Sequence, residues 1–117
     1  MDTALPPGEP GGVAPARWRG WRVVRVRGRS MLPTLRPGDL LLVRGGPRAA
    51  PGDLVVVRLP GDRPVAVKRL VARVPDGWWV ERDNPAEGVD SWSVGAVPGA
   101  GLLGRAVLRL HPRPRLF

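Results

Sequence analysis

The chain has 117 residues, 43% of them hydrophobic, which allows one domain with a modest core and is too short for two ordinary domains. Its net charge of +9 would suit nucleic acid or an anionic membrane, but the arginines are scattered and no nucleic-acid motif accompanies them, so we expect no nucleic-acid partner. The absence of cysteine excludes disulfides, a thiolate zinc site and a cysteine nucleophile, and it is compatible with the reducing cytoplasm in which we expect the protein to work.

The start of the chain does not have the pattern of a targeting segment. Residues 1–16 are rich in Pro, Gly and Ala and are expected to form a flexible lead-in. They lack both the basic start and the apolar run of a secretory signal, and no stretch of the chain approaches the ~20 apolar residues of a membrane helix. We therefore expect no transmembrane anchor, while peripheral contact with a membrane stays open.

Apolar runs bounded by turn residues predict five to seven strands and little helix. Near-alternation of apolar and basic residues from Trp21 to Arg27 is typical of a half-buried strand, and two Pro-Gly-Asp turns, 37–39 and 51–53, each precede a further strand. Residues 65–74 are also predicted to be a strand, although periodicity alone leaves a helix open there. The predicted strands are residues 21–27, 40–43, 54–57, 65–74, 78–81 and 102–110.

These strands together predict a mainly β fold, a coiled β-sheet or small barrel. The domain is expected to span residues 17–111, with an irregular stretch at 83–101 and a basic tail at 112–117. The single histidine, His111, lies beside this Pro/Arg-rich tail and is expected to be exposed, which makes it a poor member of a Ser-His-Asp triad.

Lys68 is the one lysine in a chain with 18 arginines. Arginine cannot release its proton in a protein whereas a buried lysine can, so this position indicates a need for an amine rather than for a charge. Lys68 follows the apolar run Val65-Ala66-Val67 in a predicted strand. If the side chain points inward, desolvation lowers its pKa from the usual value of about 10.4 and leaves a neutral amine that can act as a base.

Ser30 has the setting of a nucleophile, in a sharp turn at the end of a predicted strand. A serine hydroxyl is a weak nucleophile unless a base takes its proton, and Lys68 and the carboxylates are the candidate bases. The Ser30 N–H in such a turn is available to a developing oxyanion, and Gly28 lets a peptide substrate approach closely. The plainer alternative is that Ser30 is an ordinary turn residue ahead of Pro33.

Several short motifs resemble the boxes of type I signal peptidases and their relatives, in the same order and spacing from about residue 22 to residue 107. The LexA-type self-cleaving proteases belong to the same wider clan. The serine box is matched by Ser30-Met31-Leu32-Pro33-Thr34-Leu35 with Gly38-Asp39, and the lysine box by Val67-Lys68-Arg69. The C-terminal boxes of the family usually have the forms Gly-Asp-Asn, Ser-x-Asp-Ser-Arg and Gly-Arg. The segments of this chain that resemble them, in the same order, are Arg82-Asp83-Asn84, Asp90-Ser91, Gly95-x-Val97-Pro98 and Leu103-Gly104-Arg105.

The resemblance implies a serine endopeptidase with the signal peptidase/LexA type of catalytic domain and no metal or other cofactor. Ser30 would attack the scissile carbonyl, and Lys68 would take its proton and later protonate the leaving amine. The residues that would shape the oxyanion site and substrate cleft are Gly28, Met31 and Pro33, and those that would support the site from a loop are Asp90 and Ser91. Asp39, Asp83 and Asn84 are expected to fix turns and loop geometry.

Two positions depart from the family pattern. The box serine whose hydroxyl orients the lysine aligns with Gly88, and the box arginine that pairs with the aspartate aligns with Trp92. These departures leave open a weaker enzyme, another hydroxyl such as that of Ser91 assisting Lys68, and a catalytically inactive peptide-binding β-domain.

A short member without an anchor resembles the proteases that mature nickel-type superoxide dismutase by removing an N-terminal extension. The expected partner is therefore a precursor protein or peptide, with nickel superoxide dismutase as the candidate that this resemblance implies. The alternatives are an anchorless signal-peptidase-like enzyme, a LexA-like self-processing domain and an Arg-rich nucleic-acid-binding barrel. Residues 1–20 leave little room for the DNA-binding helices of the LexA type.

Overall fold

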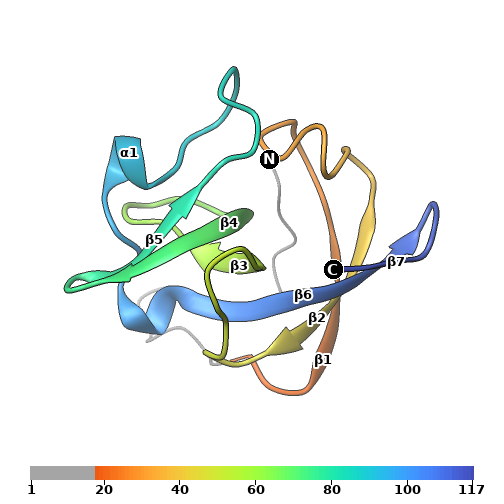
Figure 1. Ribbon diagram of the computed structural model, residues 1–117, viewed down its shortest axis with the longest axis horizontal. Helices are drawn as coiled ribbons and strands as arrows, with labels where there is room; N and C mark the ends of the chain where they lie inside the picture. The colour runs from red at the N-terminus through yellow and green to blue at the C-terminus, as the bar shows by residue number, and fades with distance from the viewer. Residues whose placement is uncertain (1–17) are drawn as a thin grey trace.

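The computed structural model describes residues 18–117 and shows a mainly β domain, so the predicted flexible segment 1–16 lies outside the described residues (Figure 1). Its strands are β1 (Trp21–Arg25), β2 (Leu40–Gly45), β3 (Leu54–Arg58), β4 (Val65–Val74), β5 (Gly77–Glu81), β6 (Leu102–His111) and β7 (Arg115–Leu116). The short helical elements are α1 (Ser91–Val94) and the 3₁₀ turn η1 (Gly99–Gly101).

All seven strands belong to one antiparallel sheet, in the order β1-β2-β6-β3-β4-β5 with β7 paired to β6. The prediction of a mainly β, coiled sheet is confirmed. The sheet does not close into a barrel, because β1 and β5 are its two ends and do not pair with each other. Residues 65–74, for which a helix had stayed open, form the strand β4.

The two Pro-Gly-Asp turns have the same local structure. In each turn the aspartate side chain accepts a backbone N–H three residues earlier, Arg36 N to Asp39 Oδ2 at 3.0 Å and Ala50 N to Asp53 Oδ2 at 2.8 Å. The intervening glycines, Gly38 and Gly52, have φ values of 94° and 97°. Because these turns reverse the chain with local hydrogen bonds, β2 and β3 begin directly after them, as predicted.

The end of the chain differs from the prediction. The strand predicted for residues 102–110 extends to His111, which is exposed, and Arg115–Leu116 within the predicted tail adds β7 to the sheet. Leu116 pairs with Leu108 on β6. A two-residue strand is too short to carry an alternating pattern, so composition alone could not reveal it.

The apolar core lies on both faces of the middle of the sheet. In β3, Leu54 and Val56 belong to one buried cluster, whereas Val55 and Val57 belong to another. The first half of β4 divides in the same way, since successive side chains of a strand point to opposite faces. A polar group placed on this part of β4 therefore faces an apolar interior.

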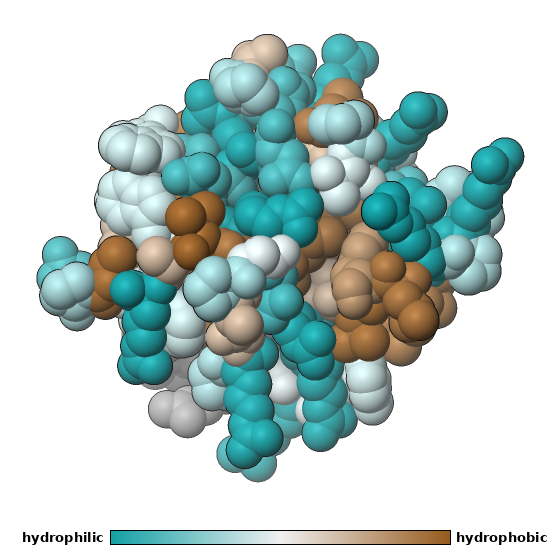
Figure 2. Space-filling view, in the orientation of Figure 1, coloured by the Kyte–Doolittle hydropathy of each residue, from teal (hydrophilic) through white to brown (hydrophobic). Residues whose placement is uncertain are grey.

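The surface carries hydrophilic side chains over much of the face in Figure 2, rather than in one continuous band. Apolar side chains gather on the side where β7 lies, and the exposed apolar residues of this end of the chain are Leu110, Leu116 and Phe117. Among the described residues, none of the helices has the length and hydropathy required to cross a membrane.

The β4–β5 hairpin has a glycine, at the start of β5, whose position leaves no space for a side chain. Gly77 has a φ of 135°, and a Cβ at this position would collide with the Val97 carbonyl oxygen. We expect Gly77→Ala to lower the free energy of unfolding by about 2 kcal/mol or more, measured by urea denaturation. Gly99→Ala, where a Cβ meets open space, is the control and should change it by less than about 0.5 kcal/mol. Equal losses in the two variants would contradict the packing argument.

Candidate active site

Ser30 and Lys68 meet in the folded chain. The Lys68 Nζ atom donates a hydrogen bond to Ser30 Oγ at 2.7 Å. Both residues are buried, with exposed fractions of 4% for Ser30 and 3% for Lys68. The two side chains that the sequence singled out therefore form one contact between the turn after β1 and the strand β4.

Strand β4 directs the Lys68 side chain into apolar surroundings. Ala66 and Leu70, two residues before and after Lys68, belong to one buried cluster, and strand alternation places Lys68 on their face of the sheet. Lys68 is also paired with the buried Val55 of β3. Lys68 is thus held among apolar side chains, and burial of an amine generally disfavours its charged form.

The turn that carries Ser30 is held by the loop that follows β5. The Ser30 carbonyl accepts the Asn84 N–H at 2.8 Å, and the Asn84 side chain donates to the Arg29 carbonyl at 2.9 Å. In Figure 1 this loop and the turn after β1 lie side by side at the top of the molecule. Within residues 18–117 the Ser30 N–H donates to no protein acceptor, so it is available to a bound group.

Asp83 ties the same turn to β4. Its carboxylate accepts hydrogen bonds from Thr34 Oγ1 at 2.6 Å and from Arg69 Nη2 at 2.7 Å. Burial would raise the pKa of Asp83, but the hydrogen bonds from Arg69 and Thr34 and the charge of Arg69 outweigh it and hold the pKa below the ordinary value of 3.8. Since Arg69 follows Lys68 directly, this contact fixes the turn that carries Ser30 relative to the strand that carries Lys68.

A cavity of about 480 Å³ opens onto the Ser30–Lys68 pair. Its apolar wall consists of Leu59, Pro64, Val65, Ala66 and Val89, and its charged residues are Arg29, Asp62, Arg63 and Glu87. Gly28, with a φ of 75°, also lines it, as expected for a residue near which a substrate passes. An apolar cavity with a few converging polar groups is the usual form of a small binding site.

Two of the residues expected to shape this cleft do not line it. Met31 is fully buried and belongs to the same core cluster as Val26 and Leu35. Pro33 is exposed and also lies outside the cavity lining. The cleft role expected for Met31 and Pro33 therefore stays a prediction, since neither residue lines this cavity.

Asp90 and Ser91 lie at the far end of the loop and begin α1. Asp90 accepts the N–H groups of Trp92 and Arg82, both at 3.0 Å, and pairs with the Arg82 guanidinium at 3.5 Å. The Ser91 hydroxyl accepts the Val80 N–H at 2.9 Å, which attaches α1 to β5. Lys68 Nζ donates to the Ser30 hydroxyl, and assistance of the lysine by Ser91 stays a prediction.

Gly88 brings the backbone of the loop after β5 close to Ser30 and Lys68. A Cβ built on Gly88 would lie 2.6 Å from Ser30 Cβ, 3.6 Å from Ser30 Oγ and 3.7 Å from Lys68 Nζ. The position of the missing box serine is thus beside the lysine, but this backbone, with a φ of 86°, leaves no space for a side chain. The loop backbone itself covers the pair.

The sequence did not reveal several cavity residues. Leu59, Asp62 and Arg63 come from the connection between β3 and β4, and Glu87 and Val89 come from the loop after β5. These segments have no motif, and only the pairing of the strands brings them together. Arg82 was noted as part of a box, but nothing in the sequence showed its contact with Asp90.

Comparison with known proteins gives two matches. The family described as Peptidase S24-like matches residues 18–96, a range that contains every residue of the cavity. Mitochondrial inner membrane protease subunit 1 of Xenopus tropicalis is 34% identical over 115 residues, and the match covers 77% of this chain and 69% of that protein. No solved structure matches.

Asp83 should make stability depend on pH in a defined direction. Its lowered pKa means that it stabilises the fold fully above its ordinary value of 3.8, and this contribution is lost as the pH falls through its folded pKa. Asp83→Asn should therefore lower the free energy of unfolding by about 1–2 kcal/mol at pH 7 and much less near pH 2. Urea titrations at several pH values measure this. The exposed Asp62→Asn is the control, and an Asp83→Asn deficit that stays constant to low pH would contradict the assignment.

Proposed function

The chain belongs to the Peptidase S24-like family, and on this premise we propose that it is a signal peptidase-like serine endopeptidase whose nucleophile is Ser30 and whose general base is Lys68. The observation that carries the proposal is the 2.7 Å hydrogen bond between these two buried side chains at the cavity. A base within hydrogen-bond reach of a hydroxyl is the arrangement that activates a serine nucleophile.

The proposed reaction follows from this arrangement. The neutral Lys68 amine takes the Ser30 hydroxyl proton as Oγ attacks the scissile carbonyl, and the Ser30 N–H donates to the oxyanion. The resulting ammonium then gives its proton to the departing amine as the peptide bond breaks and an ester forms on Ser30. Water, deprotonated by the same amine, hydrolyses the ester and restores the serine.

Lysine suits this role in a buried position because its charged form is disfavoured there, whereas arginine keeps its charge. The proton released by Ser30 therefore has an acceptor without any histidine in the site. This use of the amine explains why the one lysine of the chain is at position 68.

The proposed substrate is a precursor protein from which an N-terminal extension is removed. The apolar cavity wall favours apolar side chains next to the scissile bond. Nickel superoxide dismutase, the precursor expected from the sequence resemblance, receives no support from the comparisons, which name other proteins. A cytoplasmic site of action likewise stays a prediction.

Substitution of the dyad tests the proposal. We expect Ser30→Ala and Lys68→Arg each to lower cleavage of a peptide library by about 10³-fold or more, because one removes the nucleophile and the other replaces the base with a permanent cation. Mass spectrometry of the products measures cleavage. Ser93→Ala, at an exposed serine of α1, is the matched control and should cleave like the wild type.

The unfolding temperature of each variant shows whether it is folded, and Lys68→Met serves as a neutral replacement if Lys68→Arg does not fold. Cleavage that persists in Ser30→Ala and in a folded Lys68 variant would contradict the dyad.

Gly88→Ala should lose activity because its Cβ displaces Ser30. Gly95→Ala is a matched control: its φ of 87° is nearly that of Gly88, 86°, but a Cβ there meets nothing within 4 Å. Both variants should be destabilised by about 1–2 kcal/mol by the backbone strain, whereas only Gly88→Ala should cleave the peptide library at least about tenfold more slowly. Equal cleavage by the two variants would show that the loop does not need to approach Ser30.

A further inference from the structure

We propose that Arg82 is a positioning residue that holds the loop 83–89 closed over Ser30 and Lys68 through its pairing with Asp90. This inference rests on the proposed function, because the closed loop matters for the reaction only if the two side chains are the reacting groups. Arg82 does not line the cavity and therefore acts through the loop rather than on a substrate.

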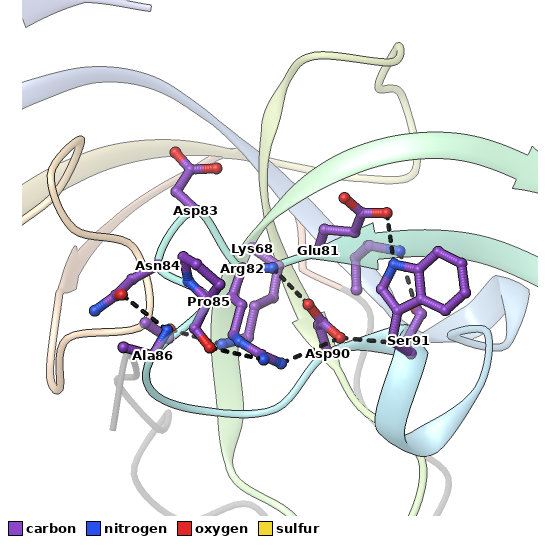
Figure 3. Close-up of polar contacts among 12 residues, drawn as sticks. Lys68, Glu81, Arg82, Asp83, Asn84, Pro85, Ala86, Asp90 and Ser91 are labelled. Carbon is purple, nitrogen blue, oxygen red and sulfur yellow. Dashed lines mark hydrogen bonds and ion pairs between the residues drawn. The ribbon is translucent and has the colours of Figure 1, made fainter.

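Arg82 and Asp90 stand at the two ends of this loop and contact each other twice. The Arg82 N–H donates to Asp90 Oδ2 at 3.0 Å, and its guanidinium lies 3.5 Å from Asp90 Oδ1. The guanidinium also donates to the Pro85 carbonyl within the loop at 3.0 Å. Figure 3 shows the Arg82 side chain between Pro85 and Asp90, so that one cation joins the start, the interior and the end of the loop.

The loop transmits this closure to the dyad by two contacts. The Asn84 N–H donates to the Ser30 carbonyl at 2.8 Å, which fixes the position of the turn that carries Ser30. Gly88 leaves no space between the loop backbone and the Ser30 side chain. An open loop would release both contacts and leave Ser30 free to move away from Lys68.

Asp90 needs a cation, because its carboxylate is buried with a side-chain exposure of 5%. An unpaired carboxylate at such a position is strongly unfavourable. The family pattern would supply the cation from position 92, but Trp92 stands there, and its ring donates to Glu81 Oε2 at 2.9 Å and contacts Trp79 edge-on. Trp92 is 73% exposed, so its side chain takes no part in the loop closure. In this chain the cation beside Asp90 comes from position 82 instead of position 92.

A second ion pair of the same geometry provides a matched control. Arg109 Nη1 lies 3.6 Å from Asp39 Oδ2, with side-chain exposures of 18% and 5%, against 22% and 5% for Arg82 and Asp90. Neither arginine lines the cavity. Arg82→Gln and Arg109→Gln therefore remove equivalent pairs, and any difference between them in catalysis reflects the loop.

Cleavage kinetics form the first arm of the test. We expect Arg82→Gln to lower kcat at least about tenfold, since small displacements of reacting groups have effects of this size, and Arg109→Gln to stay within about twofold of the wild type. Arg82→Lys should recover part of the loss. The double variant Arg82→Gln/Trp92→Arg should recover part as well, because position 92 already contacts Asp90 through its backbone. Equal kcat values for Arg82→Gln and Arg109→Gln would overturn the proposal.

Hydrogen exchange forms the second arm and does not depend on catalysis. The Asn84 amide, which donates to Ser30, should exchange at least about tenfold faster in Arg82→Gln than in Arg109→Gln. An unchanged Asn84 rate in Arg82→Gln would overturn the loop closure. If the wild type cleaves nothing while Asn84 responds as expected, the proposed function fails and the closure by Arg82 stands. If Arg82→Gln does not fold, Arg82→Lys is compared with Arg109→Lys in both arms.

Discussion

The hydrogen bond between Lys68 and Ser30 depends on where the sheet places a single amine. Lys68 belongs to a strand that is apolar on both faces in its first half, and its neighbours on the same face are core residues. In the proposed function, the burial that disfavours a lysine cation there is the same burial that leaves a neutral amine to act as the base. The interior position of β4, between β3 and β5, is therefore as much a part of the site as the side chains themselves.

Three polar residues that follow β5 hold the turn of Ser30 against this strand. Asp83 joins the turn at Thr34 to Arg69, Asn84 holds the Ser30 carbonyl, and Asp90 closes the loop from its far end. The contacts of Asp83 with Thr34 and of Asn84 with Ser30 join segments that are far apart in the chain, whereas Asp90 pairs with Arg82 across the loop. The loop thus provides the rigidity that a serine in a tight turn does not have by itself.

The sequence predicted the parts of this site that depend on residue type. A lone lysine in an apolar run and a serine before a proline turn were sufficient to identify both members of the pair, and the two Pro-Gly-Asp turns located β2 and β3. It did not show that Met31 and Pro33 lie outside the cavity lining, because the face of a turn that meets a cavity depends on packing from other segments. The contacts of Gly88 and Arg82 could not be predicted either, since they arise only when the loop folds back onto the turn.

The protonation state of Lys68 tests the account most directly. The chain has a single lysine, so labelling with ¹³Cε-lysine gives one side-chain NMR signal to follow against pH. The account predicts a titration midpoint well below the ordinary lysine value of about 10.4, with an appreciable fraction of neutral amine at pH 7. A lysine that stays fully charged up to about pH 10 would contradict its role as the base.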